Sequence, residues 1–124
     1  MKAKAKGKLF LFQWEKESAT ARAAALTKDG WEVEMECEEG SRGSKNLKAF
    51  GPDVAVFDLA KKPSHSRECG RALRNFKALR ETPFIFVDGT DENIAKTKLK
   101  VSAAVFTTSG RLAKTVTSHC RVPG

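Results

Sequence analysis

The hydrophobic positions of this chain fall into short blocks, and these blocks predict strands separated by helices. Three segments are apolar at every position: LFLF at residues 9–12, VAVF at 54–57 and FIFV at 84–87. Short apolar runs without alternation are typical of strands that are covered on both faces. We therefore expect these three segments to form the interior of a sheet.

Residues 31–38 follow a different pattern, WEVEMECE, in which apolar residues and glutamates alternate. A period of two predicts a strand with one packed face and one acidic, hydrated face. A row of like charges discourages the addition of another strand, so we expect this strand at an edge of the sheet.

Helical segments lie between the apolar blocks, and several begin with a residue suited to cap a helix. We expect Ser18, Ser66, Thr90 and Ser109 to cap helices. The patterns together predict strands at residues 8–13, 31–38, 54–58, 84–87 and 103–107. They predict helices at residues 18–28, 44–50, 66–80, 90–100 and 111–118.

The strict alternation of strands and helices predicts an α/β fold, a doubly wound five-stranded parallel sheet with helices on both faces. The strand order 2-1-3-4-5 places the half-polar second strand at an edge. A length of 124 residues favours one domain, which we place at residues 8–118. Residues 1–7 form a basic N-terminal tail and residues 119–124 a short C-terminal tail in this division.

Composition narrows the classes of protein to consider. The net charge is +8, and the segment MKAKAKGK supplies four of the lysines. Such a segment is either a solvated terminus or a contact for nucleic acid or an acidic surface. No apolar run is long enough for a membrane span or a signal peptide, so we expect a cytoplasmic protein without a membrane partner. The three cysteines are widely spaced, which predicts neither a disulfide framework nor a zinc site.

The segment PDVAVFDLAKKPSHSRECGRALR, followed by PFIFVDG and AAVFTTS, resembles the receiver domain of response regulators, the CheY-like module of two-component signalling. The resemblance covers about residues 8–118 and implies a flavodoxin-like fold. It also implies that Asp58, at the end of the third strand, is equivalent to the phospho-acceptor aspartate. In that family two acidic residues after the first strand help the acceptor to hold Mg²⁺. A Thr or Ser then ends the fourth strand, and a Lys ends the fifth.

The chain departs from this pattern at every position except the acceptor. The acidic pair is replaced by Gln13 and Trp14, the Thr or Ser by Asp88, and the Lys by Thr108, or by Thr107 if the register shifts by one residue. An amide oxygen is a weak ligand for Mg²⁺, and an indole is none. A carboxylate at Asp88 repels a phosphoryl group, and the missing lysine removes its counter-charge. We therefore expect no cofactor and no metal, with Mg²⁺ binding weak or absent.

The remaining acidic residues at this edge have two interpretations. Glu15, Asp58 and Asp88 would lie near the carboxyl edge of the sheet and could form a residual cation site. Alternatively, Glu15 points to solvent and Asp58 orders a loop. Trp14 either fills the space of the missing metal or is an exposed anchor for a partner.

The predicted third helix carries the other candidate interaction residues. Arg67, Arg71 and Arg74 recur with Lys77 on its outer side, which suits an acidic partner, nucleic acid or a solvated face. His65 lies just before them, but no nucleophile elbow or oxyanion motif accompanies it. The sequence therefore does not predict an enzyme.

These features predict a non-enzymatic pseudo-receiver that binds a protein partner in bacterial-type signal transduction, by the face of the last helices and strand. Two alternatives stay open. Asp58 is phosphorylated by a kinase through an atypical site, or the chain is a basic protein associated with nucleic acid. A homodimer is compatible with each of them.

Overall fold

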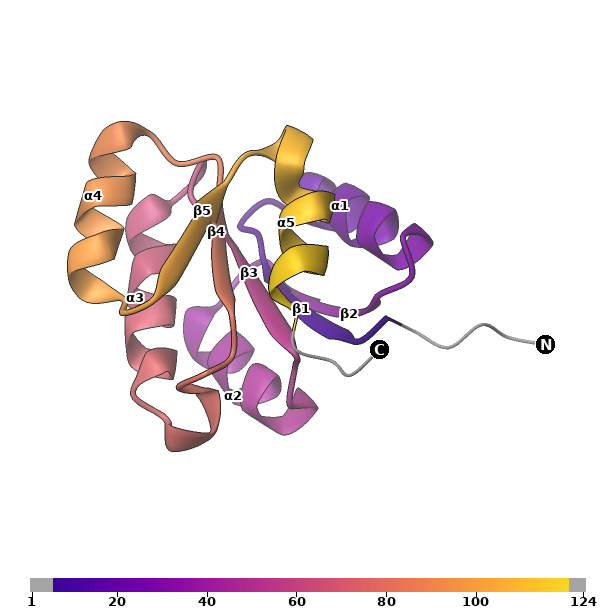
Figure 1. Cartoon of the computed structure of the whole chain (residues 1–124), viewed down its shortest axis with the longest axis horizontal. Coiled ribbons are helices and arrows are strands. Elements are labelled where there is room, and N and C mark those ends of the chain that lie inside the picture. The colour runs from indigo at the N-terminus through magenta and orange to yellow at the C-terminus, as the bar shows by residue number, and fades with distance from the viewer. Residues whose placement is uncertain (1–5, 121–124) are drawn as a thin grey trace.

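The structure, a computed structural model, describes residues 6–120 and confirms the predicted α/β architecture. Five parallel strands lie in the order β2-β1-β3-β4-β5, and helices cover both faces of the sheet (Figure 1). The strands are β1 (Lys8–Phe12), β2 (Glu32–Glu36), β3 (Val54–Asp58), β4 (Phe84–Val87) and β5 (Ala104–Thr107). The helices are α1 (Lys16–Lys28), α2 (Gly40–Phe50), α3 (Pro63–Arg74), α4 (Asp91–Lys100) and α5 (Leu112–His119), with short 3₁₀ turns η1 (Lys77–Leu79) and η2 (Ser109–Arg111).

The apolar strands divide their side chains between two cores, as continuous hydrophobic runs predict. Toward α2 and α3, Phe57 stacks between Phe12 and Phe86, with ring centroids 5.1 and 4.7 Å away. Toward α1 and α5, Leu11 and Val56 pack with residues of both helices. Full burial of such side chains contributes about 1.5–3 kcal/mol each, so the contacts between the sheet and its helices stabilise the fold.

The strand register aligns the carboxyl ends of the strands. Phe12 is paired with Phe57, and Asp58 with Val87, which is in turn paired with Thr107. Because parallel strands end at the same edge, the segments that follow β1, β3, β4 and β5 meet there.

Several helix ends differ from their predicted positions. The predicted Thr90 cap is confirmed, because its side chain accepts the Asn93 N–H at 3.2 Å. The predicted Ser18 cap is wrong: α1 begins two residues earlier, and the Ser18 hydroxyl donates to the Glu15 carbonyl. Ser66 also lies inside its helix, which begins at Pro63.

The predicted helix over residues 66–80 ends early, at Arg74, and the short turn η1 follows it. The guanidinium of Arg74 donates to the carbonyls of Leu79 at 2.7 Å and Thr82 at 2.8 Å, and therefore holds the chain in its turned path. Only 8% of Arg74 is exposed, and its guanidinium lies 3.8 Å from the ring of Phe84. The prediction that Arg74 belongs to a solvated, partner-facing stripe is wrong.

The edge position of β2 is confirmed, but one of its glutamates is not hydrated. Glu36 is 5% exposed and accepts hydrogen bonds from the guanidinium of Arg42 at 2.9 and 2.7 Å. The hydrogen bond from Arg42, which outweighs the opposing effect of burial, lowers the pKa of Glu36 to about 2. On the other face of the strand, Met35 is 37% exposed, although the alternation predicted it to be packed.

Some residues of the predicted tails belong to the folded part. The Lys6 N–H donates to the carbonyl of Gly30, and the Gly7 carbonyl accepts from Glu32, so both extend the first strand region. Helix α5 continues to His119. The rest of both predicted tails, residues 1–5 and 121–124, lies outside the described residues. Within residues 6–120, no helix is long and apolar enough to cross a membrane.

Candidate functional site

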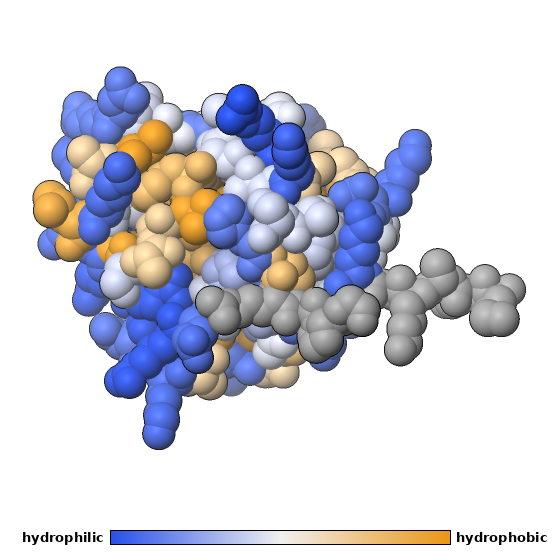
Figure 2. All heavy atoms as spheres, in the orientation of Figure 1, coloured by the Kyte–Doolittle hydropathy of each residue, from blue (hydrophilic) through white to orange (hydrophobic). Residues whose placement is uncertain are grey.

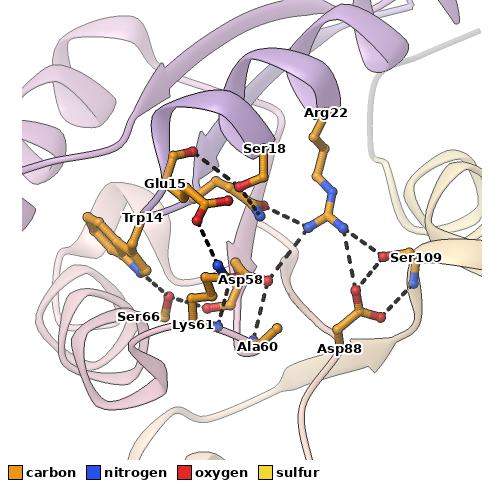
Figure 3. A network of polar contacts seen from close by, with 11 residues as sticks. Trp14, Glu15, Ser18, Arg22, Asp58, Ala60, Lys61, Ser66, Asp88 and Ser109 are labelled. Carbon is orange, nitrogen blue, oxygen red and sulfur yellow. Dashed lines mark hydrogen bonds and ion pairs between the residues drawn. The ribbon is translucent and has the colours of Figure 1, made fainter.

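Arg22, on α1, lies at the centre of a polar network at the carboxyl edge of the sheet (Figure 3). Its Nη1 donates to Gln13 Oε1 at 2.7 Å and lies 3.8 Å from Asp58 Oδ1. Its Nη2 donates to Ser109 Oγ at 2.7 Å and lies 3.5 Å from Asp88 Oδ2. One guanidinium thus connects the ends of β1, β3 and β4 with the loop that follows β5.

Asp58 ends β3, as predicted, and is almost completely enclosed, with 1% of its surface exposed. Its carboxylate accepts the backbone N–H groups of Ala60 at 3.3 Å and Lys61 at 3.0 Å. Burial raises the pKa of Asp58, although these backbone donors and the charge of Arg22 act in the opposite direction. Asp58 therefore orders the loop after β3, which is one of the two roles expected for it.

Asp88 follows β4 in a left-handed conformation, with φ of 60°. The Ser109 N–H donates to Asp88 Oδ1 at 2.8 Å, and the Ser109 hydroxyl donates to Oδ2. Burial would raise the pKa of Asp88, but the hydrogen bonds from Ser109 and the charge of Arg22 lower it below its usual value. Ser109 is therefore a partner of Asp88, and the prediction that it caps the last helix is wrong, since α5 begins at Leu112.

The three carboxylates proposed as a residual cation site have separate partners. Glu15 pairs with Lys61 Nζ at 2.6 Å, whereas Asp58 and Asp88 share Arg22. Across residues 6–120, no group of three or more His, Cys, Asp or Glu side chains is arranged to hold a metal ion. The guanidinium of Arg22 already contacts both Asp58 and Asp88 and the Gln13 side-chain oxygen.

Trp14 is buried, with 7% of its surface exposed, so the expectation of an exposed anchor is wrong. Its Nε1 donates to Ser66 Oγ at 2.7 Å, and Ser66 donates in turn to the Asp58 carbonyl. The edge of His65 meets the indole with ring centroids 4.3 Å apart. Figure 3 shows Trp14 and Arg22 on opposite sides of Asp58, so Arg22 rather than Trp14 lies beside the carboxylate.

The position at the end of β5 carries no lysine. The strand ends at Thr107, opposite Val87, and the Thr107 hydroxyl shares a hydrogen bond with Thr115 of α5 at 2.8 Å. Thr108 follows and is exposed. Of the two positions considered from sequence, Thr107 is the one that ends the strand.

The basic stripe of α3 does not form one continuous surface. Arg71 is exposed and pairs with Glu68 at 2.9 Å, and Arg67 is half-buried. Arg74 is enclosed, as described above. These three arginines therefore have three different environments, although their sequence spacing is regular.

Arg22 is the central residue of this network, and the sequence analysis did not indicate it. It is the only arginine of α1 and stands among alanines, at TARAAA. A long cationic side chain on an otherwise small-residue face, in the helix after the first strand, is the signal that could have identified it. Its partners were not apparent because Asp88 and Ser109 lie 66 and 87 residues further along the chain.

Several solved structures of similar fold are receiver domains or response regulators. Vibrio cholerae chemotaxis protein CheY4 superposes with a TM-score of 0.78 at 19% identity, covering 94% of this chain and 99% of CheY4. The BeF₃-activated receiver domain of Klebsiella pneumoniae RstA gives 0.72 at 21% identity, covering 93% and 99%. The receiver domain of the Pseudomonas aeruginosa sensor histidine kinase PA1611, with Mg²⁺ coordinated in its active-site cleft, gives 0.74 at 14% identity, covering 93% and 98%.

These similarities establish that the chain has the CheY-like receiver fold. No protein-family model and no curated protein sequence matches the chain.

Proposed function

We propose that this chain is a pseudo-receiver, a non-enzymatic module that binds a protein partner in two-component-type signal transduction without Mg²⁺-dependent phosphorylation of Asp58. The observation that carries the proposal is the position of Arg22, whose guanidinium contacts Asp58 and Asp88 together. An arginine is permanently charged and covalently attached, so it supplies a counter-charge that cannot be exchanged for a metal.

Phosphoryl transfer to a carboxylate needs an accessible oxygen and a cation that stabilises the developing charge on the phosphoryl group. Here Asp58 is 1% exposed and both its oxygens accept backbone hydrogen bonds. Asp88 adds a second negative charge close by, which would repel an incoming phosphate. Mg²⁺ is coordinated in the active-site cleft of the PA1611 receiver, whereas in the described part of this chain Arg22 contacts the side-chain oxygens of Gln13, Asp58 and Asp88, which supports weak or absent binding of the ion.

Receivers commonly bind partners through their last helices and strand, and we extend this role to the present chain by fold analogy. Figure 2 shows hydrophobic side chains over α4 and β5, bordered by hydrophilic ones. Leu99 of α4 is 85% exposed, the largest exposure among the large hydrophobic residues described. Helix α4 contacts β5, which carries the half-buried Phe106, and an exposed leucine on this face suits a protein contact.

The test is exposure of the purified protein to Mg²⁺ with acetyl phosphate, and separately with BeF₃⁻, with the RstA receiver as the positive control. We expect no acyl phosphate on phosphate-affinity gels or by intact mass. We also expect no change in the amide NMR spectrum with BeF₃⁻. Stable phosphorylation of Asp58 that disappears in Asp58→Asn would contradict the proposal.

The nucleic-acid alternative has less support than the sequence suggested, because Arg74 is enclosed and does not contribute to a basic surface. If it were correct, retention on nucleic acid would fall steeply with salt concentration. Salt-dependent retention that is lost in Arg67→Ala/Arg71→Ala would favour this alternative.

A further inference from the structure

A groove at the amino-terminal end of the strands has no role in the site described above. It lies between the end of α2 and the turn η1, both at the lower edge of Figure 1, away from the Arg22 network. Its volume is about 300 Å³, which can hold one large side chain with its neighbours. The groove is lined by Lys48, Gly51, Pro52, Phe76, Lys77, Ala78 and Leu79.

Phe76 forms an aromatic wall of this groove and is 43% exposed. The ammonium of Lys48 lies over its ring, 3.9 Å from the centroid. A cation held against the ring face limits the motion of both side chains. The ring is therefore presented to solvent in a restricted orientation, as in binding sites that lose little side-chain entropy on binding.

The charged side chains that line the groove are all positive. Two of its lining residues, Lys48 and Lys77, are exposed lysines, and no acidic side chain lines it. Pro52 and Leu79 complete an apolar floor between them and are buried. An apolar hollow beside an exposed aromatic ring, flanked by two ammonium groups, is complementary to an aromatic side chain that has carboxylates next to it.

We propose that this groove, named here the Lys48–Phe76 groove, binds an acidic segment of a partner protein through an aromatic anchor residue. Nucleic acid fits less well, because its backbone requires a row of positive charges, and this groove offers two lysines around one short hollow. The inference goes beyond the proposed function, since the groove is separate from the α4–β5 face and from Asp58.

The test is fluorescence anisotropy with a labelled peptide in which one Phe is flanked by Asp and Glu residues, added to the full chain. Three probes serve as controls: the peptide with Ala in place of Phe, the peptide with Lys in place of its acidic residues, and a single-stranded oligonucleotide of the same length. We expect the acidic Phe peptide to bind more tightly than each control, and its affinity to fall with salt.

The groove variants identify the site. The double variant Lys48→Glu/Lys77→Glu should weaken binding about tenfold or more, and Phe76→Ala by a similar factor. The matched control is Lys45→Glu/Lys114→Glu, which changes the net charge equally at two exposed lysines outside the groove and should alter the affinity less than about twofold. The lysine variants retain the ring, so they test the site even if Phe76→Ala unfolds the protein.

Chemical shifts on titration should change around residues 48–52 and 76–79. Leu99→Glu, on the α4–β5 face considered for the proposed function, should leave peptide binding unchanged. Failure of the groove proposal is therefore distinguishable from failure of the proposed function. Absence of peptide binding, or equal binding by the groove variants, would overturn the inference. Tighter binding of the oligonucleotide that is lost in the same variants would show that the class of partner is wrong.

Discussion

Arg22 and Arg74 each gather several hydrogen-bond acceptors, but the acceptors of the two residues differ in charge. Arg22 contacts two carboxylates, Asp58 and Asp88, with 16% of its side chain exposed. Among residues 6–120, Arg74 pairs with no carboxylate. It donates to four backbone carbonyls, those of Leu79, Arg80, Thr82 and Ser102.

This difference separates an arginine that bonds to neutral carbonyls from one that pairs with charged carboxylates. Burial without a counter-ion lowers the pKa of Arg74, yet an arginine stays protonated at any ordinary pH. Its bonds to neutral carbonyls close the turn after α3 and cannot be titrated. The contacts of Arg22 depend on the ionisation of its partners, the two carboxylates at the carboxyl edge of the sheet. Substitutions of the two arginines therefore test where the stability of the fold depends on ionised partners and where it depends on neutral hydrogen bonds.

The largest effect is expected for Arg74→Ala, which removes a shared donor from four buried or partly buried backbone carbonyls and opens space beside Phe84. We expect a loss of about 3 kcal/mol in the free energy of unfolding, measured from urea denaturation. Arg71→Ala, on the exposed side of the same helix, is the control and should cost at most about 0.5 kcal/mol. A small loss for Arg74→Ala would mean that water replaces the guanidinium without cost.

Arg22→Ala should cost less, about 1–2 kcal/mol at neutral pH, because water can reach the partly open network and hydrate Asp88. Most of this loss should come from the enclosed charge of Asp58. Adding Asp58→Asn should therefore recover about 1 kcal/mol, as measured by a double-mutant cycle in urea. Strictly additive effects of the two substitutions would show that Arg22 and Asp58 are not coupled.

The two arginine variants should also differ in their dependence on pH. The pKa of Asp58 is raised above 3.8, so its folded state binds a proton more tightly than the unfolded state, and acidification toward pH 3.8 favours folding at this residue. Without Arg22 the pKa of Asp58 rises further. The loss in the free energy of unfolding caused by Arg22→Ala should therefore become smaller as the pH falls from 7 to about 4. The loss in the free energy of unfolding caused by Arg74→Ala should stay constant over this range. The measurement is the free energy of unfolding of the wild type and both variants from pH 7 to about 4, and an equal pH dependence of the two losses would contradict the prediction.

The smallest effect concerns a hydrogen bond between neutral groups. Trp14→Phe removes the indole donor to Ser66 but keeps an aromatic ring against Phe12 and His65. Ser66 retains its bond to the Asp58 carbonyl, so we expect a loss of about 1 kcal/mol, seen as a modest decrease in Tm. A loss as large as that of Arg74→Ala would show that the stability of the region around Trp14 depends on packing of the indole and not only on its hydrogen bond.

The sequence predicted the elements well where a pattern of neighbouring residues carries the information. The apolar runs of β1, β3 and β4, the edge position of β2 and the Thr90 cap were all apparent from local spacing. Helix ends were less predictable, because serine can cap a helix or bond elsewhere. Ser18, Ser66 and Ser109 each use the hydroxyl for a different contact.

The location of the candidate site was predicted from the sequence, but not all of the residues and contacts that form it. Asp58, Gln13 and Asp88 lie at one edge because the register of a parallel sheet brings strand ends together. Burial of Glu36 was not predicted, and burial of Trp14 was only one of two expected environments. Each depends on a partner from another element, Arg42 for Glu36 and Ser66 for Trp14.

By itself, the sequence determined the strand order, the two buried faces and the aspartate at the end of β3, because hydrophobic periodicity follows directly from strand and helix geometry. Only the tertiary structure decided that Arg22 lies between Asp58 and Asp88 and that Arg74 is enclosed. Arginine has a long, flexible side chain, and its position depends on which acceptors the folded chain brings within reach. Those acceptors lie up to 87 residues away in the sequence, so only the folded sheet brings them together.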